Sequence, residues 1–147
     1  MNRRPLLIRP DAYPPALNVV GTDVIVLASK QDTQGLEFTY QSGESGMGPP
    51  PHSHEWDEAF FVIRGSVEFT YDGKTELCTN GTLFFVPSGT IHAFQYGPDG
   101  GEMIELTGAG SRAAQLFTAI DTETLQGSPK VEKIVEIMGQ NGVTVHL

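Results

Sequence analysis

The alternation of apolar and polar residues between about residues 19 and 107 predicts a succession of short strands. Residues 36–41 and 67–71 alternate with a period of two, which is typical of half-buried strands. Residues 59–63 are apolar without interruption, which predicts a strand buried on both faces. We expect further strands at residues 19–20, 24–27, 75–78, 82–86, 92–96 and 102–107.

Residues that favour turns separate these strands. Asp72-Gly73 is a hairpin signal, and we expect the chain also to turn or break at Gly21-Thr22, Gly65-Ser66, Asn80-Gly81 and 97–101. Strands and turns that recur at such short spacing predict an all-β body, either a sandwich or a small barrel.

Beyond residue 107 the pattern becomes helical. Ser111 can cap a helix that runs to about Ile120. Ser128-Pro129 predicts the start of a second helix, with serine as the cap and proline at the first helical position. Its apolar residues fall on one helical face, and Gly139 suits its end; they are Val131, Ile134, Val135 and Met138.

We therefore expect one domain over residues 1–147. It consists of a core at about 19–107 and a helical C-terminal appendage at about 111–147. Residues 1–16 are rich in proline and predict an irregular arm laid across the body. Residues 143–145 predict a last short strand.

Composition narrows the classes of function. The net charge is −9, and the nine Lys and Arg residues are scattered along the chain. A basic stripe that could neutralise a nucleic-acid backbone is therefore missing from the sequence, and so is the cationic cluster that a sugar-phosphate substrate requires. No apolar run reaches the length of a membrane span or of a signal-peptide core, so we expect a cytoplasmic protein without membrane or nucleic-acid partners.

The single cysteine, Cys78, excludes an internal disulfide. It could be a reactive thiolate or a small residue within a strand. The second interpretation fits better, because no histidine is near it in the sequence.

Residues that could form a functional site occur close together at His52-Ser53-His54 and at Glu58. Residues two apart on an extended strand point to the same side, and a tight turn after His54 would bring Glu58 back toward the histidine pair. His92 follows a Pro-Ser-Gly turn and starts another strand. Imidazole and carboxylate together suit Fe, Mn, Ni, Co, Cu or Zn. The alternative is a group of solvated loop residues beside a proline-rich turn.

Two spaced motifs distinguish these possibilities. Gly46, His52, His54, Glu58 and Gly65 match every position of the first motif of the cupin superfamily. The second motif is matched by Gly81, Pro87, Gly89 and His92, whereas its last position is Tyr96 in place of asparagine. The sequence thus resembles small single-domain cupins of the quercetin dioxygenase-like type over about residues 35–107.

The resemblance implies a double-stranded β-helix, the cupin jelly-roll barrel. It also implies one divalent transition metal ion per chain, held by His52, His54, Glu58 and His92. Glu58 would in addition serve as the catalytic base. Cupins of this size are commonly dimers, and the proline-rich arm and the apolar strand at 59–63 are consistent with a homodimer.

The parity of strand residues suggests the lining of a substrate pocket next to the metal. We expect an apolar, aromatic cavity lined by Phe38, Tyr40, Phe60, Phe94 and Tyr96, with Met47 and Trp56 flanking the ligands in loops. For each aromatic residue the alternative is plain core packing.

Three functions are compatible with such a site. The first is a metal-dependent dioxygenase acting on a small apolar or aromatic enolic or phenolic substrate. The second is a non-redox, metal-dependent isomerase or lyase. The third is a cupin that binds a small molecule without turnover.

Overall fold

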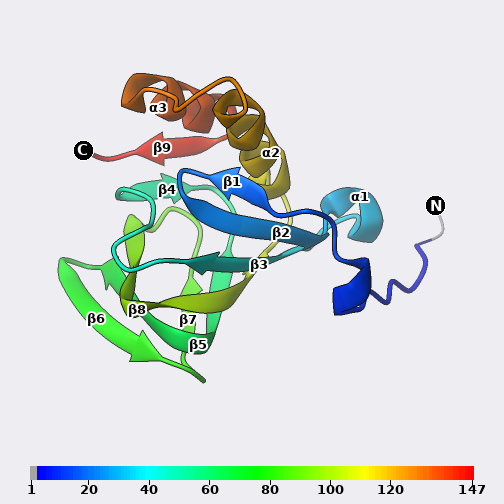
Figure 1. Cartoon of the computed structure of the whole chain (residues 1–147), viewed down its shortest axis with the longest axis horizontal. Coiled ribbons are helices and arrows are strands. Elements are labelled where there is room, and N and C mark those ends of the chain that lie inside the picture. Colours follow the sequence, from blue (N-terminus) through cyan, green and yellow to red (C-terminus); the bar gives the residue numbers. More distant parts are fainter. Residues whose placement is uncertain (1–2) are drawn as a thin grey trace.

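The structure, a computed structural model, describes residues 3–147. Its body is one strongly curled sheet of nine strands, and two helices cover one end of it (Figure 1). The strands are β1 (Leu17–Val19), β2 (Thr22–Ala28), β3 (Glu37–Gly43), β4 (His52–His54), β5 (Glu58–Tyr71), β6 (Lys74–Thr79), β7 (Leu83–Val86), β8 (His92–Thr107) and β9 (Val143–Val145). The helices are α1 (Lys30–Thr33), α2 (Ala113–Thr124) and α3 (Val131–Gln140), with a 3₁₀ turn at Pro10–Ala12.

The long strand β8 connects the parts of the sheet. Its second half pairs with β3 on one side and with the first half of β5 on the other, and all of these pairs are antiparallel. Its first half pairs with the second half of β5, and His92 at its start pairs with β4. The sheet therefore closes into the predicted cupin β-barrel.

The two longest strands correct the sequence prediction. Gly65-Ser66 does not reverse the chain, and residues 97–101 do not end a strand; β5 and β8 run through both segments. The register of β5 on β8 shifts around Gly65, whose φ is +68°. A β-carbon on Gly65 would overlap the carbonyl of Gly100, so glycine lets two bent strands cross in close contact.

Several local predictions are confirmed. The hairpin at Asp72-Gly73 joins β5 to β6, with both residues at positive φ. The helix predicted after Ser111 is present as α2, and the hydroxyl of Ser111 accepts a hydrogen bond from the amide of Ala113. The N-cap residue is Arg112, however, and the helix runs to Thr124, beyond the predicted end at about Ile120. The short helix α1 was missed, although Ser29 and Asp32 form a capping box at its start.

The ends of α3 differ from the prediction. The helix begins after Lys130, two residues beyond Ser128-Pro129, and it continues through Gly139 to Gln140. The glycine that ends it is Gly142, which has a φ of +82°. None of the helices in residues 3–147 has the length and apolarity needed to span a bilayer.

Two hydrophobic clusters fill the molecule. The first lies inside the barrel and contains Phe60, Val62, Val67, Phe69, Val86, Phe94, Tyr96 and Met103. The second joins the helices to the barrel end and contains Trp56, Leu116, Ile120, Ile137, Met138 and Val143. The C-terminal segment is thus packed onto the barrel, and β9 pairs with β4, the strand that carries His52 and His54.

Candidate metal centre

Four side chains that are distant in sequence meet where the helices cover the barrel. His52 and His54 lie on β4, Glu58 opens β5, and His92 opens β8. His52 and His92 are register partners, and the carbonyl of His54 accepts a hydrogen bond from the amide of Gly89 at 2.8 Å. One ligand atom from each of the four side chains lies within 4.8 Å of the others, and all four residues are buried.

Backbone carbonyls orient the three imidazole rings. Nδ1 of His52 lies 2.8 Å from the carbonyl oxygen of Pro50, Nδ1 of His54 lies 3.0 Å from that of Trp56, and Nδ1 of His92 lies 2.9 Å from that of Thr90. A carbonyl only accepts hydrogen bonds, so each ring carries its proton on Nδ1. In the neutral imidazole Nε2 is then a lone-pair donor to a metal.

This arrangement leaves a conflict that a cation resolves. Nε2 of His54 lies 3.0 Å and Nε2 of His92 lies 2.9 Å from the same Oε1 of Glu58. With the proton on Nδ1, each of these contacts brings two hydrogen-bond acceptors together. A metal ion among these atoms would bind all of them, so the donor set fits a transition metal.

Burial and charge shift the pKa values of this cluster in different directions. Burial raises the pKa of Glu58, but the hydrogen bond from Glu105 and the close contacts with His54 and His92 outweigh it and hold the pKa well below its usual range. Burial, together with the charge on His92, lowers the pKa of His52 to about 4. Burial opposes the charged form of His92 as well, yet the hydrogen bond to Glu58 raises its pKa.

Glu105 on β8 is a functional candidate that sequence reasoning missed. It is buried, lies beside Glu58, and accepts a hydrogen bond of 3.1 Å from Oγ1 of Thr39. Burial and the Glu58 carboxylate raise its pKa well above the usual range. The surroundings of the two adjacent carboxyl groups therefore act in opposite directions, favouring the ionised form of Glu58 and the neutral form of Glu105.

The local sequence around Glu105 was misleading. Ile104 and Leu106 flank it, and an apolar–polar alternation normally places the apolar residues inside. The register of β8 on β5 pairs Glu105 with Phe60, a residue of the barrel core. Glu105 therefore faces inward, and its apolar neighbours Ile104 and Leu106 face outward. Only this pairing identifies the buried acid.

A cavity of about 480 Å³ opens onto the cluster beneath the helices. His52, His54, Glu58 and Glu105 line it, together with Gln41 and Thr22 from the sheet. The rest of the lining is mostly apolar and includes Val24, Trp56, Phe60, Phe94, Leu116, Phe117, Ile120, Ile134, Val135 and Met138. The cavity is therefore polar at the cluster and apolar beneath α2 and α3.

Of the residues expected to line the pocket, Phe60 and Phe94 line this cavity. Phe38 and Tyr40 do not, because the inward residues of β3 are Glu37, Thr39 and Gln41. The phenol of Tyr40 instead donates a hydrogen bond to Glu102, which raises the Tyr40 pKa. Placing Phe38 and Tyr40 in the cavity was wrong, because the apolar parity of β3 faces outward.

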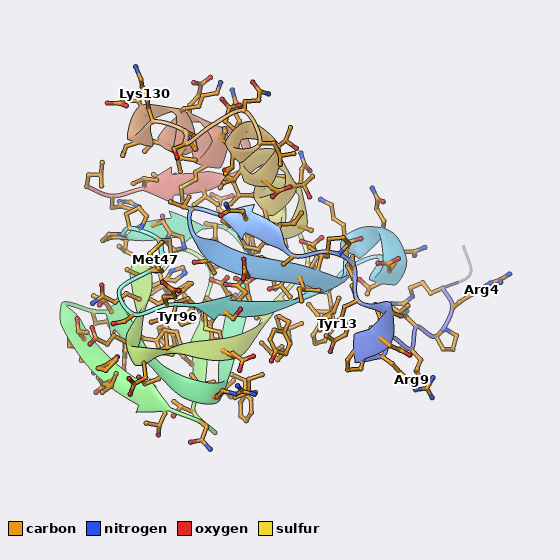
Figure 2. All side chains as sticks on the ribbon, viewed as in Figure 1. Arg4, Arg9, Tyr13, Met47, Tyr96 and Lys130 are labelled. Atoms are coloured by element: carbon orange, nitrogen blue, oxygen red, sulfur yellow. The ribbon has the colours of Figure 1, made fainter. Side chains whose placement is uncertain are left out.

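Met47 and Tyr96 also lie outside the cavity lining, and both lie on the barrel side of the molecule (Figure 2). Met47 packs on the barrel core, and its carbonyl accepts the amide hydrogen of Tyr96 at 2.9 Å. Tyr96 points inward, as its parity predicts, and is buried. Its hydroxyl has no hydrogen-bond partner within residues 3–147, and burial raises its pKa.

Trp56 has a larger role than its loop position suggested. Its ring stacks on His54, with centroids 4.4 Å apart and planes 8° from parallel. It is buried and also packs in the helical cluster. Trp56 thus ties the metal-facing histidine to the helices that cover the cavity.

Comparison with known proteins places this site in a family. The family described as "Cupin domain" matches residues 36–104. Quercetin 2,3-dioxygenase of Bacillus subtilis is 30% identical over 97 residues, which is 65% of this chain and only 28% of that protein's length.

Solved structures show the same fold. An RmlC-like cupin from Shewanella frigidimarina matches with a TM-score of 0.64 at 20% identity, covering 75% of this chain and 96% of that one. The polyketide cyclase RemF from Streptomyces resistomycificus matches with a TM-score of 0.60 at 22% identity, covering 74% and 80%. With its two motifs, its barrel and its buried cluster of three histidines and a glutamate, the segment at residues 36–104 is a cupin domain.

Proposed function

We propose that this protein is a metal-dependent dioxygenase for a small apolar or aromatic substrate with an enolic or phenolic hydroxyl. His52, His54, Glu58 and His92 would hold one divalent transition metal ion. The observation that carries the proposal is the set of lone pairs directed at one buried point, at the polar end of an apolar cavity. The 30% identity to a quercetin dioxygenase supports the reaction class.

The bound metal, Glu58 and Glu105 would have separate roles in the reaction. A bound redox metal would supply coordination of the ionised substrate oxygen and electron transfer to dioxygen. Glu58, which is ionised, is the base within reach of the substrate hydroxyl. Glu105 holds a proton beside it and keeps Glu58 in the charged form.

The cavity walls select and shield the substrate. Phe60, Phe94 and Trp56 pack close to the cluster and exclude water from it. Gln41 and Thr22 offer hydrogen bonds on one wall, whereas the helices supply apolar contacts over the opposite end. A flat molecule with one polar edge fits this division.

Metal loading is the first test. The purified protein would be stripped with a chelator, reloaded separately with Fe, Mn, Ni, Co, Cu and Zn, and analysed by mass spectrometry for metal per chain. We expect one ion per chain in the wild type and almost none in His54→Ala. His146→Ala is the matched control, because His146 bonds Ser53 outside the cluster. Full loading of His54→Ala would refute the metal site.

Oxygen consumption is the second test. Each loaded form would be given a flavonol and other enediols, and oxygen uptake would be followed with an electrode. We expect uptake with at least one redox metal and none in His54→Ala. Glu58→Gln should lower kcat more than it changes KM, because it keeps a ligand oxygen but loses the base.

A non-redox, metal-dependent isomerase or lyase is the second candidate. The observation that favours it is the pair Glu58 and Glu105, an ionised and a neutral carboxyl in contact, which can take a proton from one atom and return it to another. Turnover of an enolisable substrate under argon would establish this function in place of the dioxygenase. Tight binding without turnover in either atmosphere would leave a small-molecule-binding cupin.

A further inference from the structure

The turn between β1 and β2 holds a valine in a conformation that valine rarely adopts. Val19 pairs with Thr22, so the loop between the strands consists of Val20 and Gly21. Both have positive φ, +53° for Val20 and +85° for Gly21, as a type I′ hairpin turn requires. Asparagine, aspartate or glycine normally occupies the first of these positions, because a β-branched side chain crowds the backbone at positive φ. The backbone of Val20 is therefore strained.

Contacts from β1, from α2 and from the loop before β4 hold this turn in place. The side-chain oxygen of Asn18 accepts a hydrogen bond of 2.9 Å from the amide of Gly21. The amide of Asn18 donates a hydrogen bond of 2.8 Å to Oδ1 of Asp121, so the turn is fastened to a helix that covers the cavity. On its other side, a β-carbon on Gly21 would overlap the side chain of Met47. These contacts fix the conformation in which Val20 is strained.

Packing in the core does not account for a valine at this position. Val20 is 51% exposed, and its side chain lines the cavity that opens onto the metal cluster. Val131 at the start of α3 lines the same cavity and is 70% exposed. The turn between β1 and β2 and the start of α3 lie on the same side of the molecule (Figure 1). Val20 and Val131 therefore mark the place where the cavity meets solvent.

The lining near this opening is apolar and uncharged. The lining residues that adjoin Val20 and Val131 in the chain are Val19, Pro129, Ile134 and Val135. The carboxyl groups of the lining, Glu58 and Glu105, belong to the metal end, and among residues 3–147 no Lys or Arg lines the cavity. An anionic group would find no counter-charge at the opening, whereas an uncharged hydrocarbon or aromatic group would bury apolar surface there.

We propose that Val20 is a specificity-determining residue, held at the cavity opening to contact an uncharged apolar group of the substrate, either an alkyl chain or an aromatic ring. The inference rests on the proposed function for the polar head of the substrate, which would reach the metal cluster. Val20 and the start of α3 contact the part of the substrate that extends toward solvent. This contact explains why a strained and half-exposed valine occupies a position that suits asparagine.

Binding of an uncharged dye tests the proposal. The full chain as purified is titrated with N-phenyl-α-naphthylamine, whose fluorescence rises in apolar surroundings and which has no hydroxyl or carboxylate to place on a metal. Val20→Asn should raise the Kd about 10-fold, because it removes part of the apolar contact surface. The same variant should raise the urea midpoint of unfolding, because asparagine suits the first position of a type I′ turn. A valine with a merely structural role would not give weaker binding in a more stable protein.

Two further variants are the controls. Val20→Ile stays β-branched and apolar, so it should keep both the Kd and the urea midpoint of the wild type. Phe85→Ser changes an exposed side chain on the outer side of β7 and should leave the Kd unchanged if the dye binds in the cavity. A wild type that does not bind the dye would overturn the proposal. So would an unchanged Kd in Val20→Asn, or a Kd that Phe85→Ser raises as much as Val20→Asn does.

Competition separates this inference from the proposed reaction. Unsubstituted flavonol should displace the dye with an inhibition constant about 10-fold lower in the wild type than in Val20→Asn. Equal inhibition constants in the two proteins would overturn the role of Val20 in selecting the substrate. A flavonol that does not displace the dye, while the Kd of the dye still depends on Val20, would refute the proposed substrate and support the apolar contact at Val20.

Discussion

The strands β5 and β3 both bury alternate residues, but they turn opposite kinds of residue toward the barrel interior. In β5 the inward residues after Glu58 are Phe60 and Val62, and Phe61 faces solvent, so the prediction that residues 59–63 are buried on both faces was wrong. In β3 the inward residues are Glu37, Thr39 and Gln41, all polar, and the aromatic residues lie outside. The comparison teaches that the hydrophobic pattern of a strand does not by itself say which of its faces is buried.

The polar interior of β3 is built from partners on other elements. Glu37 accepts hydrogen bonds from the amide of Ala114 and the hydroxyl of Ser111 at the start of α2, and from the amide of Lys30. Thr39 donates to Glu105, and the side-chain amide of Gln41 donates to Thr39. Buried polar groups are tolerated when they are hydrogen-bonded. The inward residues of β3 therefore hold the start of a helix and one wall of the cavity, whereas the inward residues of β5 pack in the hydrophobic core.

The largest loss of stability is expected for the apolar inward residues of β5. Phe60→Ala empties a fully buried site and should cost about 3–5 kcal/mol of unfolding free energy. Phe61→Ala on the same strand should cost under about 1 kcal/mol in the monomer. Urea denaturation at low protein concentration measures both values. Equal losses for the two variants would contradict the assigned inward face of β5.

The next effect concerns pH and the metal-free protein. The pKa of His52 is lowered to about 4 in the folded chain, against about 6.5 when unfolded. Its contribution to stability is therefore complete above about pH 6.5 and is lost as the pH falls toward about 4, because the unfolded chain binds the proton first. The loss amounts to roughly 3 kcal/mol at most.

His92 acts in the opposite sense, because its pKa is raised. Denaturant titrations between about pH 7 and about pH 4, the window set by the His52 shift, should thus compare the wild type with His52→Gln, both treated with chelator. The slope of unfolding free energy against pH should be shallower in the variant. An unchanged slope would show that His52 titrates normally in the folded protein.

Glu37→Ala probes the polar side of the comparison. It leaves the buried hydroxyl of Ser111 and two backbone amides at the starts of α2 and α1 without an acceptor, and should cost about 2–3 kcal/mol. Hydrogen exchange should show loss of protection at the start of α2, while β5 stays protected. The matched control is Asp32→Ala, which removes an exposed carboxylate from the cap of α1 and should cost about 1 kcal/mol without affecting α2.

The smallest effect is expected for Thr39→Val, which keeps the shape of the side chain and removes its hydrogen bonds to Glu105 and from Gln41. The cost should be about 1 kcal/mol. Metal content should stay at the wild-type level, whereas the pH profile of turnover should shift, because Glu105 lies beside Glu58. An unchanged profile would exclude a positioning role for the Thr39–Glu105 contact.

The metal cluster was the part of the site most accessible from sequence. His52 and His54 lie two apart on a strand, and Glu58 and His92 each begin a strand, so local geometry and the motif spacing indicated their convergence. The cavity lining was less accessible. Phe60 and Phe94 lie where strand parity put them, but several other expected lining residues do not, and the buried acid on β8 was overlooked.

Strand boundaries were predicted correctly where local sequence preference decides them, and wrongly where pairing between distant strands decides them. The hairpin at Asp72-Gly73 depends on two residues at positive φ, which local preference supplies. Gly65 and residues 97–101 carry equally strong turn signals, yet they form bends within continuous strands. Pairing of β5 with β8 on both sides of each bend outweighs the local preference.

The sequence by itself determined the β-rich body, the helical tail and the identity of the four candidate ligands, because periodicity, turn preference and ligand spacing are local properties. Only the tertiary structure decided which face of β3 is buried, which acid lies beside Glu58, and how the helices cover the cavity. Those features depend on pairing between distant strands. A polar residue is stable inside the barrel only when another element supplies its hydrogen-bond partner.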